Sequence, residues 1–431
     1  MERNPAQVMP VLGMISIALL AACGTSTTTT APSSSAGGGS LANCTGSVTV
    51  ASDLPTSGSD ASDGKPTQNG AQLAVNQANA SHLLGGCTLK YTPKDDSSVA
   101  LGKHDPQQGA QNITGLAGDL SVVGVVGPFN SSVAKSEMPI ANQANLVMIS
   151  PSNTNPGLTI VGSNPDIDTA SLRPTGTITY FRVCTTDIGQ GKGLASVATG
   201  KLQAKQAFVI DDQETYGKGL ADQFTKFYTG SGGTVVKRVS LPGSTKDFKA
   251  QLTEAKNDGS TLIFFGGTSS NGGGIIRKQM AELNITAKFE GGDGIVDDEF
   301  FTEAGSAGDG AYGTIAAPDP TKLDSAAKFL SDYKAAFSAD PGAYSANAYD
   351  AMNVILTAVK KVLVDNGGKL PTDPAGFRES VRKAVAATDY NGAIGHTTFD
   401  KNGDTTNALL TLKVGQGGKW VYSDTIKQTI S

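Results

Sequence analysis

The 431-residue chain has few residues of the types that commonly carry catalysis. Its three histidines, His82, His104 and His396, are far apart, and it has no G-x-S-x-G turn, P-loop or paired metal-ligand motif. His104, beside Asp105 at the start of an expected helix, is interpreted as a surface residue. The sequence Asp-Lys-Asn-Gly-Asp at 400–404 lacks the spacing and the distal Glu of a calcium loop and is interpreted as a β-turn. We therefore expect no enzyme, no cofactor and no metal.

Charge of one sign does not accumulate along the chain. There are 34 Lys and Arg residues against 39 Asp and Glu, for a net charge of −5, and the basic residues are not clustered. Nucleic-acid binding needs a basic patch that neutralises phosphates, so nucleic acid is excluded as a partner. Only one long apolar run is present, near the N-terminus, so the rest of the chain is expected to be soluble apart from any attached lipid.

The N-terminus has the features of a secretory signal. Arg3 and an apolar run at 11–20 precede the tetrad Leu-Ala-Ala-Cys that ends at Cys23. The tetrad resembles a bacterial lipobox, which implies removal of residues 1–22 and a lipid on Cys23. Residues 23–43 have almost no charge or apolar bulk and are expected to be a flexible tether. We therefore expect a lipid-anchored protein on the extracytoplasmic face of the membrane, periplasmic or extracellular.

Expected strands and helices alternate along the mature chain. The strands are expected at 47–52, 87–92, 122–126, 146–149, 179–183, 206–211, 234–240, 261–266 and 288–291. The helices are expected at 68–80, 105–118, 133–145, 189–202, 216–231, 245–258, 273–283 and 297–304. This alternation predicts an α/β protein with doubly wound sheets, and the chain is long enough for two lobes.

Two of these strands, at 122–126 and 146–149, end in turns rich in Ser, Thr and Asn. The turn at 128–132 precedes a helix, whose free N–H groups favour an anion, and the turn at 151–155 follows the second strand directly. If the strands are parallel neighbours, both turns lie at the carboxyl edge of one sheet, where open α/β sheets bind ligands. Each turn by itself also fits simple helix capping.

The cysteines other than Cys23 have separate expected roles. Cys44 precedes the strand at 47–52, and Cys87 opens the strand at 87–92. If those strands are adjacent and parallel, the two cysteines meet at the end opposite the ligand edge, and an exported protein permits the disulfide. Cys184 has no basic neighbour in sequence and is expected to be a buried free thiol.

A series of motifs resembles the periplasmic-binding-protein type I family, and specifically the branched-chain amino-acid binding proteins of ABC importers. The motifs are G-x-x-x-S-S and I-S-P-S-x-T within 124–159, YFRVCTTD at 180–187, DDQETYGKGLAD at 211–222, FFGG at 264–267, GGDG at 291–294, AYDA at 348–351 and FDKNGD at 399–404. The resemblance spans about residues 47 to 422. It implies two Rossmann-like lobes joined by a three-strand hinge, with lobe one at about 45–182 and 317–393 and lobe two at 183–316 and 394–431.

The resemblance also implies how a ligand is held. Ser131 and Thr154 correspond to residues that bind an α-carboxylate through hydroxyl and backbone N–H groups. The Ser152 carbonyl and the Thr154 hydroxyl correspond to partners of the α-ammonium, and Asp293 corresponds to the acid that pairs with it from lobe two. Tyr216 matches an aromatic that packs on the ligand. Considered without the resemblance, Asp293 and Tyr216 also fit ordinary turn positions.

The chain departs from the family at two positions. Asp63 and Thr268 stand where relatives have aromatic residues facing the ligand side chain, while Phe129 remains as an apolar wall. The predicted pocket is therefore more polar and roomier than one built for leucine.

We expect a monomeric solute-binding lipoprotein that closes around an amino acid, branched-chain-like or more polar, and delivers it to ABC permease subunits. Two alternatives remain open. One is a binder of an uncharged small amide-type solute, and the other is a lipid-anchored ligand sensor with the same fold.

Overall fold

The computed structural model describes residues 40–427. The expected signal peptide at 1–22, Cys23 and the tether up to residue 39 lie outside the described residues. No helix in the described part of the chain is both long enough and apolar enough to cross a membrane.

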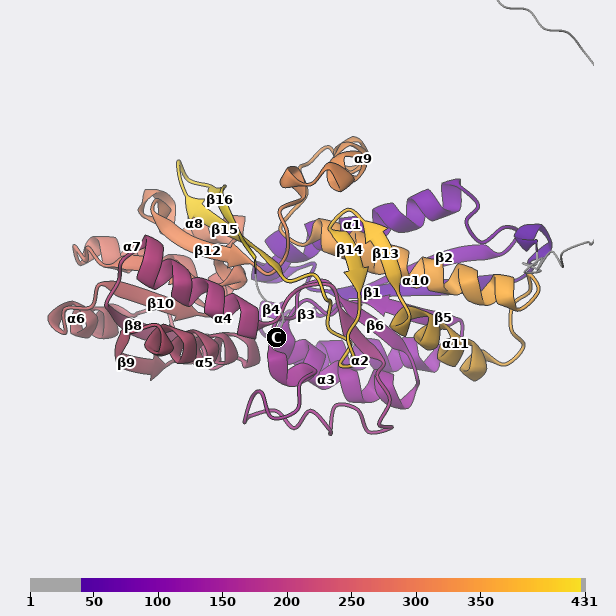
Figure 1. The fold of residues 1–431 in the computed structure, drawn as a ribbon, viewed down its shortest axis with the longest axis horizontal. Coiled ribbons are helices and arrows are strands. Elements are labelled where there is room, and N and C mark those ends of the chain that lie inside the picture. The colour runs from indigo at the N-terminus through magenta and orange to yellow at the C-terminus, as the bar shows by residue number, and fades with distance from the viewer. Residues whose placement is uncertain (1–39, 428–431) are drawn as a thin grey trace, which may run out of the picture. The chain divides into compact units, whose positions relative to one another are not determined.

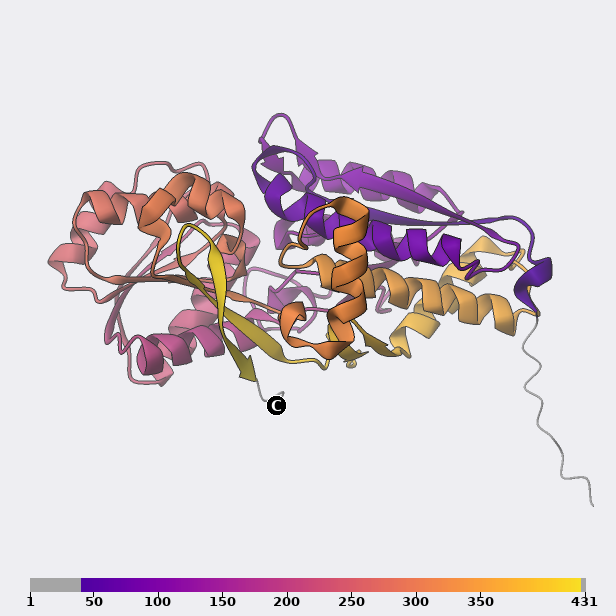
Figure 2. The same ribbon diagram turned by 90° about the horizontal axis from the view of Figure 1, so that it is seen from above.

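Lobe one is built on a five-stranded parallel sheet with strand order β2-β1-β5-β6-β7. Its strands are β1 (Ser47–Leu54), β2 (Thr88–Asp95), β5 (Val122–Val126), β6 (Val147–Ser150) and β7 (Tyr180–Arg182). Every residue of β5 and β6 is buried, as expected where helices cover both faces of a parallel sheet. The covering elements are α1 (Ala61–Ala80), α2 (Pro106–Gly118), α3 (Ser131–Gln143), α10 (Ser345–Asp365) and α11 (Pro374–Ala386), and α9 (Ala327–Phe337) packs beside α1 (Figures 1 and 2).

Lobe two is built on a seven-stranded sheet with order β16-β15-β12-β11-β10-β8-β9. The strands are β8 (Gln206–Asp211), β9 (Thr234–Ser240), β10 (Leu262–Gly266), β11 (Lys288–Gly291), β12 (Ala311–Ile315), β15 (Leu409–Gly415) and β16 (Trp420–Lys427). Strands β8 to β12 are parallel, whereas β15 and β16 are antiparallel additions at one edge. The helices are α4 (Asp187–Ser196), α5 (Thr215–Gly230), α6 (Lys249–Asn257), α7 (Gly273–Glu282) and α8 (Asp298–Ala304) (Figure 1).

Within residues 40–427 the chain passes between the two sheets three times, after β7, after β12 and after the hairpin of β13 (Asp389–Gly392) and β14 (Gly395–Thr398). The hairpin stays with lobe one because Asp350 of α10 accepts hydrogen bonds from the backbone N–H groups of Ala393 and Ile394, at 2.9 and 2.8 Å. The lobe boundary expected at residue 393 falls inside this hairpin. Phe399, directly after it, packs against the core of lobe one.

Helix α1 begins at Ala61 rather than at residue 68, so the loop expected before it is much shorter. The Gly- and Asp-rich sequence has low intrinsic helix propensity, but tertiary packing outweighs that preference. A Cβ atom at Gly64 would lie 1.8 Å from the carbonyl oxygen of Pro55, so the glycine allows the first turn to lie against the end of β1. Asp63 is therefore a helix residue and not a loop residue.

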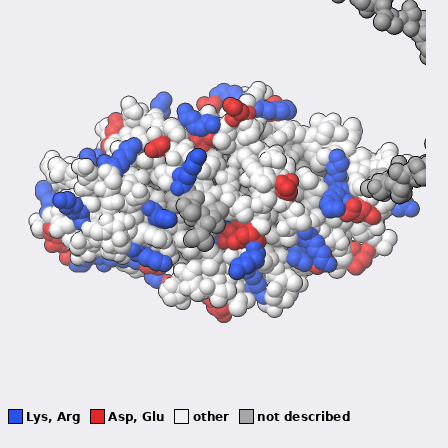
Figure 3. All heavy atoms as spheres, viewed as in Figure 1, with Lys and Arg blue, Asp and Glu red and all other residues white. Residues whose placement is uncertain are grey.

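The structure has a disulfide between Cys44 and Cys87, with Cα atoms 4.9 Å apart, and β1 and β2 are the adjacent parallel strands that bring them together. Cys184 is a buried free thiol, as predicted, and its Sγ donates to the carbonyl oxygen of Asn153 at 3.2 Å. On the face shown in Figure 3, basic and acidic side chains are interspersed.

Candidate ligand-binding site

The two Ser- and Asn-rich turns of lobe one lie side by side. Strands β5 and β6 are parallel neighbours, as the sequence predicted, so the turns that follow them share the carboxyl edge of the sheet. Ser150 Oγ donates to the carbonyl oxygen of Pro128 at 2.8 Å and accepts from the backbone N–H of Asn153 at 2.9 Å. The Ser152 hydroxyl and the Asn153 amide both donate to the carbonyl oxygen of Phe129, at 2.9 and 2.6 Å. The turns therefore form one hydrogen-bonded unit.

The start of α3 faces this unit with free backbone donors. Ser131 is the first helical residue, and the first intrahelical hydrogen bond is donated by Ala134 to the carbonyl oxygen of Asn130, at 3.0 Å. The N–H groups of residues 131–133 therefore precede the helical ladder and are suited to an anion. Ser131 is buried, with 2% of its surface exposed, so its hydroxyl adds a sheltered polar group.

Thr154 lies between the lobes. Its carbonyl oxygen accepts from the backbone N–H of Asp187, the first residue of α4, at 2.8 Å. The Thr154 hydroxyl lies near the Asp187 carboxylate and lowers the pKa of Asp187. Thr154 Oγ1 and Asp187 Oδ2 are both buried, and neither has a hydrogen-bond partner within residues 40–427. Burial, followed by the charge of Asp293, raises the pKa of Asp187 to about 7.

Asp293 follows β11 at the carboxyl edge of the second sheet. Its Oδ1 accepts from the Tyr216 hydroxyl and from Gln190 Nε2, both at 2.8 Å, and its Oδ2 accepts from the Tyr344 hydroxyl at 2.6 Å. Burial raises the pKa of Asp293, and these three hydrogen bonds oppose the rise. The partners are all neutral, so none of them cancels the charge of the carboxylate.

Two short chains of contacts join Asp293 to the turns of lobe one. In the first, Gln190 Nε2 donates to both Asp293 and Asp187, at 2.8 Å each, and Asp187 contacts Thr154. In the second, the ring of Tyr344 packs edge-on against Phe129, with centroids 5.7 Å apart. Phe129 is therefore an apolar wall beside the acidic group.

Gln190 and Tyr344 were not singled out by the sequence analysis. Gln190 lies three residues beyond the YFRVCTTD motif, and Tyr344 caps α10 four residues before the AYDA motif, so position near a motif was the only available signal.

Arg182 also emerges only from the structure, although it lies within the YFRVCTTD motif. It is completely buried and forms an ion pair with Asp404 at 2.6 Å between Nε and Oδ1. Its Nη1 donates to the carbonyl oxygens of Asn153 and Asn155, at 2.9 Å each. The residue thus ties the second turn to the last passage between the sheets. The turn expected at 400–404 is present, with Asp400 Oδ1 accepting from the N–H groups of residues 402 and 404.

Asp63 and Thr268, the two predicted departures from the family pattern, lie near Asp293 or the turn that carries it. A Cβ atom at Gly294 would lie 2.7 Å from Tyr216 and 3.2 Å from Thr268, so these side chains surround the same turn. Burial and the nearby charges of Asp297, Asp60 and Asp293 raise the pKa of Asp63 well above its usual range.

Asp63 also lines a cavity of about 740 Å³ between the lobes. The walls include Asp63 and Pro66 from lobe one and Asp297, Lys413 and Trp420 from lobe two, but not Ser131, Thr154 or Asp293. Val296 and Ala343 also line the cavity, so it lies beside the segments that carry Asp293 and Tyr344.

His104 is not the surface residue expected from the sequence. It is 3% exposed, with Nδ1 2.5 Å from Asp60 Oδ2 and Nε2 3.7 Å from Glu214 Oε2. Burial would lower its pKa, but Asp60 and Glu214 raise it to about 10. Lys103 pairs with Glu214 at 2.8 Å and donates to Asn271 at 2.6 Å. Lys103 and His104 thus connect lobe one to Glu214 at the N-cap of α5, and Lys103 also reaches Asn271 in the turn after β10. A local sequence pattern could not reveal these contacts.

Two Rossmann-like lobes joined by three passages of chain, with polar turns from both sheets meeting between them, define a cleft-type solute-binding protein. The chain belongs to the periplasmic binding protein family, whose model matches residues 47–419. Proteins of this family bind solutes and are not enzymes.

The sequence is 28% identical over 382 residues to a Leu/Ile/Val-binding protein of Rhizobium johnstonii, and the match covers 88% of this chain and 94% of that protein. The structure is similar to a branched-chain amino acid transporter substrate-binding protein of Streptococcus pneumoniae in complex with isoleucine, with a TM-score of 0.75, 26% identity and coverage of 89% and 100%. It also shares its fold with a solute-binding protein of Rhodopseudomonas palustris in complex with benzoate, with a TM-score of 0.71, 22% identity and coverage of 89% and 98%.

Proposed function

We propose that this protein binds a zwitterionic amino acid between its lobes and delivers it to an ABC importer. Lobe one, at about 45–182 and 317–393, would hold the carboxylate with Ser131, Thr154 and the N–H groups at the start of α3. The ammonium would be held from lobe one by the Ser152 carbonyl and the Thr154 hydroxyl and from lobe two by Asp293, while Tyr216 would pack on the ligand. Closure around the ligand is favoured because the closed form makes contacts to it from both lobes.

The observation that supports this proposal is the chemical difference between the polar groups of lobe one and those of lobe two. Free N–H groups and hydroxyls gather in lobe one, whereas the half-buried carboxylate of Asp293 and the buried carboxylate of Asp187 lie in lobe two with only neutral hydrogen-bond donors among the described residues. A buried carboxylate without a cationic partner is costly, and a ligand ammonium would offset that cost. The same ligand's carboxylate would reach the neutral half-site.

The names of the relatives favour the same ligand class. A Leu/Ile/Val-binding protein and a binding protein in complex with isoleucine both match across most of this chain. Asp63, Thr268 and the 740 Å³ cavity favour a ligand larger or more polar than leucine.

A matched ligand series tests the proposal on the purified protein. Thermal shift and calorimetry would compare L-leucine, L-isoleucine, L-glutamine and L-arginine with analogues lacking one charge: leucinamide, 4-methylpentanoate and isoamylamine. Only ligands with both charges should raise the melting temperature, because a ligand that binds only the folded state stabilises it.

Other outcomes assign a different ligand. Strong binding of leucinamide or simple amides with no amino-acid binding would favour the uncharged-solute alternative, with Asp63 as a polar contact. Binding of benzoate alone would place the protein with the aromatic-acid binders that share its fold. Either result would overturn the zwitterion clamp.

We further propose that a lipid on Cys23 holds the protein on the extracytoplasmic face of the membrane and that permease subunits receive the ligand. In cells, Cys23→Ala should release folded protein from the membrane fraction, while Cys184→Ala should remain membrane-bound. Deletion of permease genes adjacent to this gene should abolish ligand uptake; intact uptake with a lost transcriptional response would instead indicate a sensor.

A further inference from the structure

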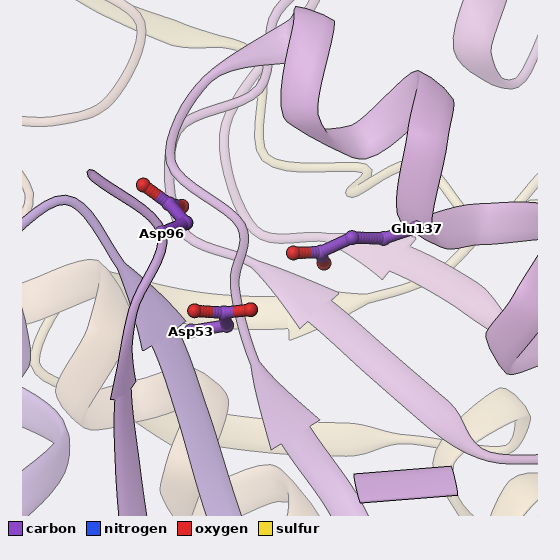
Figure 4. A group of neighbouring side chains, drawn as sticks. All are labelled: Asp53, Asp96 and Glu137. Carbon is purple, nitrogen blue, oxygen red and sulfur yellow. The ribbon is translucent and has the colours of Figure 1, made fainter. Parts of the chain in front are cut away.

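Three buried carboxylates of lobe one have no part in the proposed ligand site. Asp53 belongs to β1, Asp96 directly follows β2, and Glu137 lies in α3. All three residues are 0% exposed, and one oxygen from each lies within 4.8 Å of the oxygens from the other two. Figure 4 shows Glu137 extending from its helix toward Asp53 and Asp96, which come from the neighbouring strands.

Most of these oxygens lack a donor. Asp53 Oδ1 accepts from Asn112 Nδ2 at 2.9 Å, but Asp53 Oδ2 and both oxygens of Asp96 and Glu137 have no hydrogen-bond partner within residues 40–427. No Lys or Arg of the described chain forms an ion pair with any of the three. Desolvating an unpaired carboxylate costs several kcal/mol, so three together require a positive partner. The cationic His104 opposes the rise in the pKa of Asp96, but its ring nitrogens pair with Asp60 and Glu214, so the remaining partner is either a shared proton or a metal cation.

The surrounding structure holds the carboxylates in position. Asn112 of α2 donates to Asp53 and also to the carbonyl oxygen of Asp95, at 2.8 Å, which fixes the backbone beside Asp96. A Cβ atom at position 109 of α2 would lie 2.8 Å from Glu137 Oε1, so Gly109 leaves room for the Glu137 carboxylate. The group is therefore supported by the sheet and by two helices.

We propose that Asp53, Asp96 and Glu137 bind one hard divalent cation, and that Ca²⁺ is the ion that fits best. A separation of up to 4.8 Å between ligand oxygens is about twice a Ca–O bond of about 2.3–2.6 Å, so one ion reaches all three residues. An all-carboxylate donor set selects hard cations over zinc or copper. Mg²⁺ usually keeps several waters, whereas Ca²⁺ takes six to eight oxygen ligands and accepts carboxylates bidentately, so three carboxylates can supply most of its ligands in a fully buried site.

The bound cation would cross-link β1, the end of β2 and α3 within lobe one. Helix α3 begins at Ser131, so the ion would also stabilise the helix whose N-terminus faces the proposed ligand site. The inference itself does not rest on the proposed function, because the three residues lie outside that site.

Direct binding to the full-length protein tests the proposal. Protein stripped with EDTA and dialysed would be studied by equilibrium dialysis with ⁴⁵Ca²⁺ and by thermal unfolding with CaCl₂, MgCl₂ or MnCl₂. We expect one Ca²⁺ per chain and a melting temperature about 3–5 °C higher at saturating calcium. No bound ion at millimolar concentrations of any of the three salts would overturn the proposal in favour of a shared proton.

A pair of matched variants locates the site. Glu137→Gln should weaken calcium binding by about tenfold or more and remove the thermal shift. Glu290→Gln is the control, because Glu290 is also a fully buried glutamate without a hydrogen-bond partner in the described chain but belongs to β11 of lobe two. It should keep the calcium response. Equal calcium responses in the two variants would place the ion elsewhere.

If Glu137→Gln does not fold, crystals of the parent protein soaked in MnCl₂ decide the question. An anomalous peak within bonding distance of the three carboxylates supports the site, and a peak at any other position refutes it.

Discussion

At the proposed ligand clamp, the two turns of lobe one present neutral groups, whereas lobe two presents the carboxylates of Asp187 and Asp293. The turns of lobe one hydrogen-bond to one another through Ser150, Ser152 and Asn153, so their shape does not depend on any single ligand-facing side chain. In lobe two, Asp293 is held by side chains from three distant segments, among them Tyr216 and Tyr344. Under the proposed function, lobe one would provide a preassembled anion site and lobe two would provide the charge that recognises a cation.

The largest expected effect comes from removing the anchor of the lobe-one turns. Arg182→Met would leave Asp404 without its ion-pair partner and would remove one hydrogen bond from each of the carbonyl oxygens of Asn153 and Asn155. Breaking a buried pair in this way should lower the free energy of unfolding by about 3–5 kcal/mol. Urea unfolding measures the change. Arg277→Met is the control, because within residues 40–427 the Arg277 side chain donates only to the Asp309 carbonyl oxygen, at 3.3 Å. A loss as large in the control would contradict the special role of Arg182.

The second-largest expected effect comes from removing the charge of Asp293 in lobe two. Asp293→Asn keeps the shape but removes the partner of a desolvated ammonium, which should cost about 2–5 kcal/mol of binding, or roughly 30-fold or more in affinity. Isothermal titration with the identified ligand gives the value. The exposed Asp258, also in lobe two, provides the control variant Asp258→Asn. Unchanged affinity in Asp293→Asn would show that the ammonium is held elsewhere.

A smaller loss of binding is expected when a ligand-facing side-chain group is removed from lobe one. Ser131→Ala removes one hydroxyl, but the backbone N–H groups at the start of α3 remain for the carboxylate. The expected loss is about 1–2 kcal/mol of binding. The comparison between the lobes is wrong if Ser131→Ala weakens binding more than Asp293→Asn under the same conditions.

The smallest effect on ligand binding is a pH dependence from Asp187, whose pKa is raised to about 7 by burial and by Asp293. Because the folded pKa lies above the ordinary value of 3.8, the folded protein holds a proton that the unfolded chain has released. The contribution to stability is present below about pH 4 and is lost as the pH rises through 7.

A ligand ammonium would favour the ionised form of Asp187, so binding near pH 6 should release part of a proton. Affinity should then rise by about tenfold between pH 5.5 and 7.5. Calorimetry in buffers of different ionisation enthalpy measures the released proton. Asp187→Asn should flatten the pH profile, and a profile that keeps its slope in this variant would assign the proton to another group.

The local sequence pattern was sufficient to predict much of the fold. Apolar runs bounded by turn residues predicted β5 and β6, and the Asp105-Pro106 pair marked the start of α2 where the structure has it. The beginning of α1 was missed because Gly64 and its polar neighbours favour a loop locally, while close packing against Pro55 requires the helix. The elements after residue 304, including β15 and β16, were not assigned because no clear alternation continued there.

The residues of the candidate site also divide into those that the sequence predicted and those that only the structure revealed. Ser131, Ser152 and Thr154 follow their strands directly, so chain order alone placed them together. Gln190 and Tyr344 reach Asp293 from 103 and 51 residues away in sequence, and no local pattern carries such contacts. The burial of His104 was missed for the same reason, since Asp60 and Glu214 come from separate segments.

The sequence by itself determined the α/β architecture, the adjacency of the two Ser- and Asn-rich turns and the family, because periodicity, turn residues and motif order are properties of the chain. Only the tertiary structure decided which charges are buried and what faces them. It left Asp293 among neutral donors and brought Asp53, Asp96 and Glu137 together away from solvent. The reason is that burial and electrostatic environment depend on contacts between distant segments, and these form only when the sheets and helices pack.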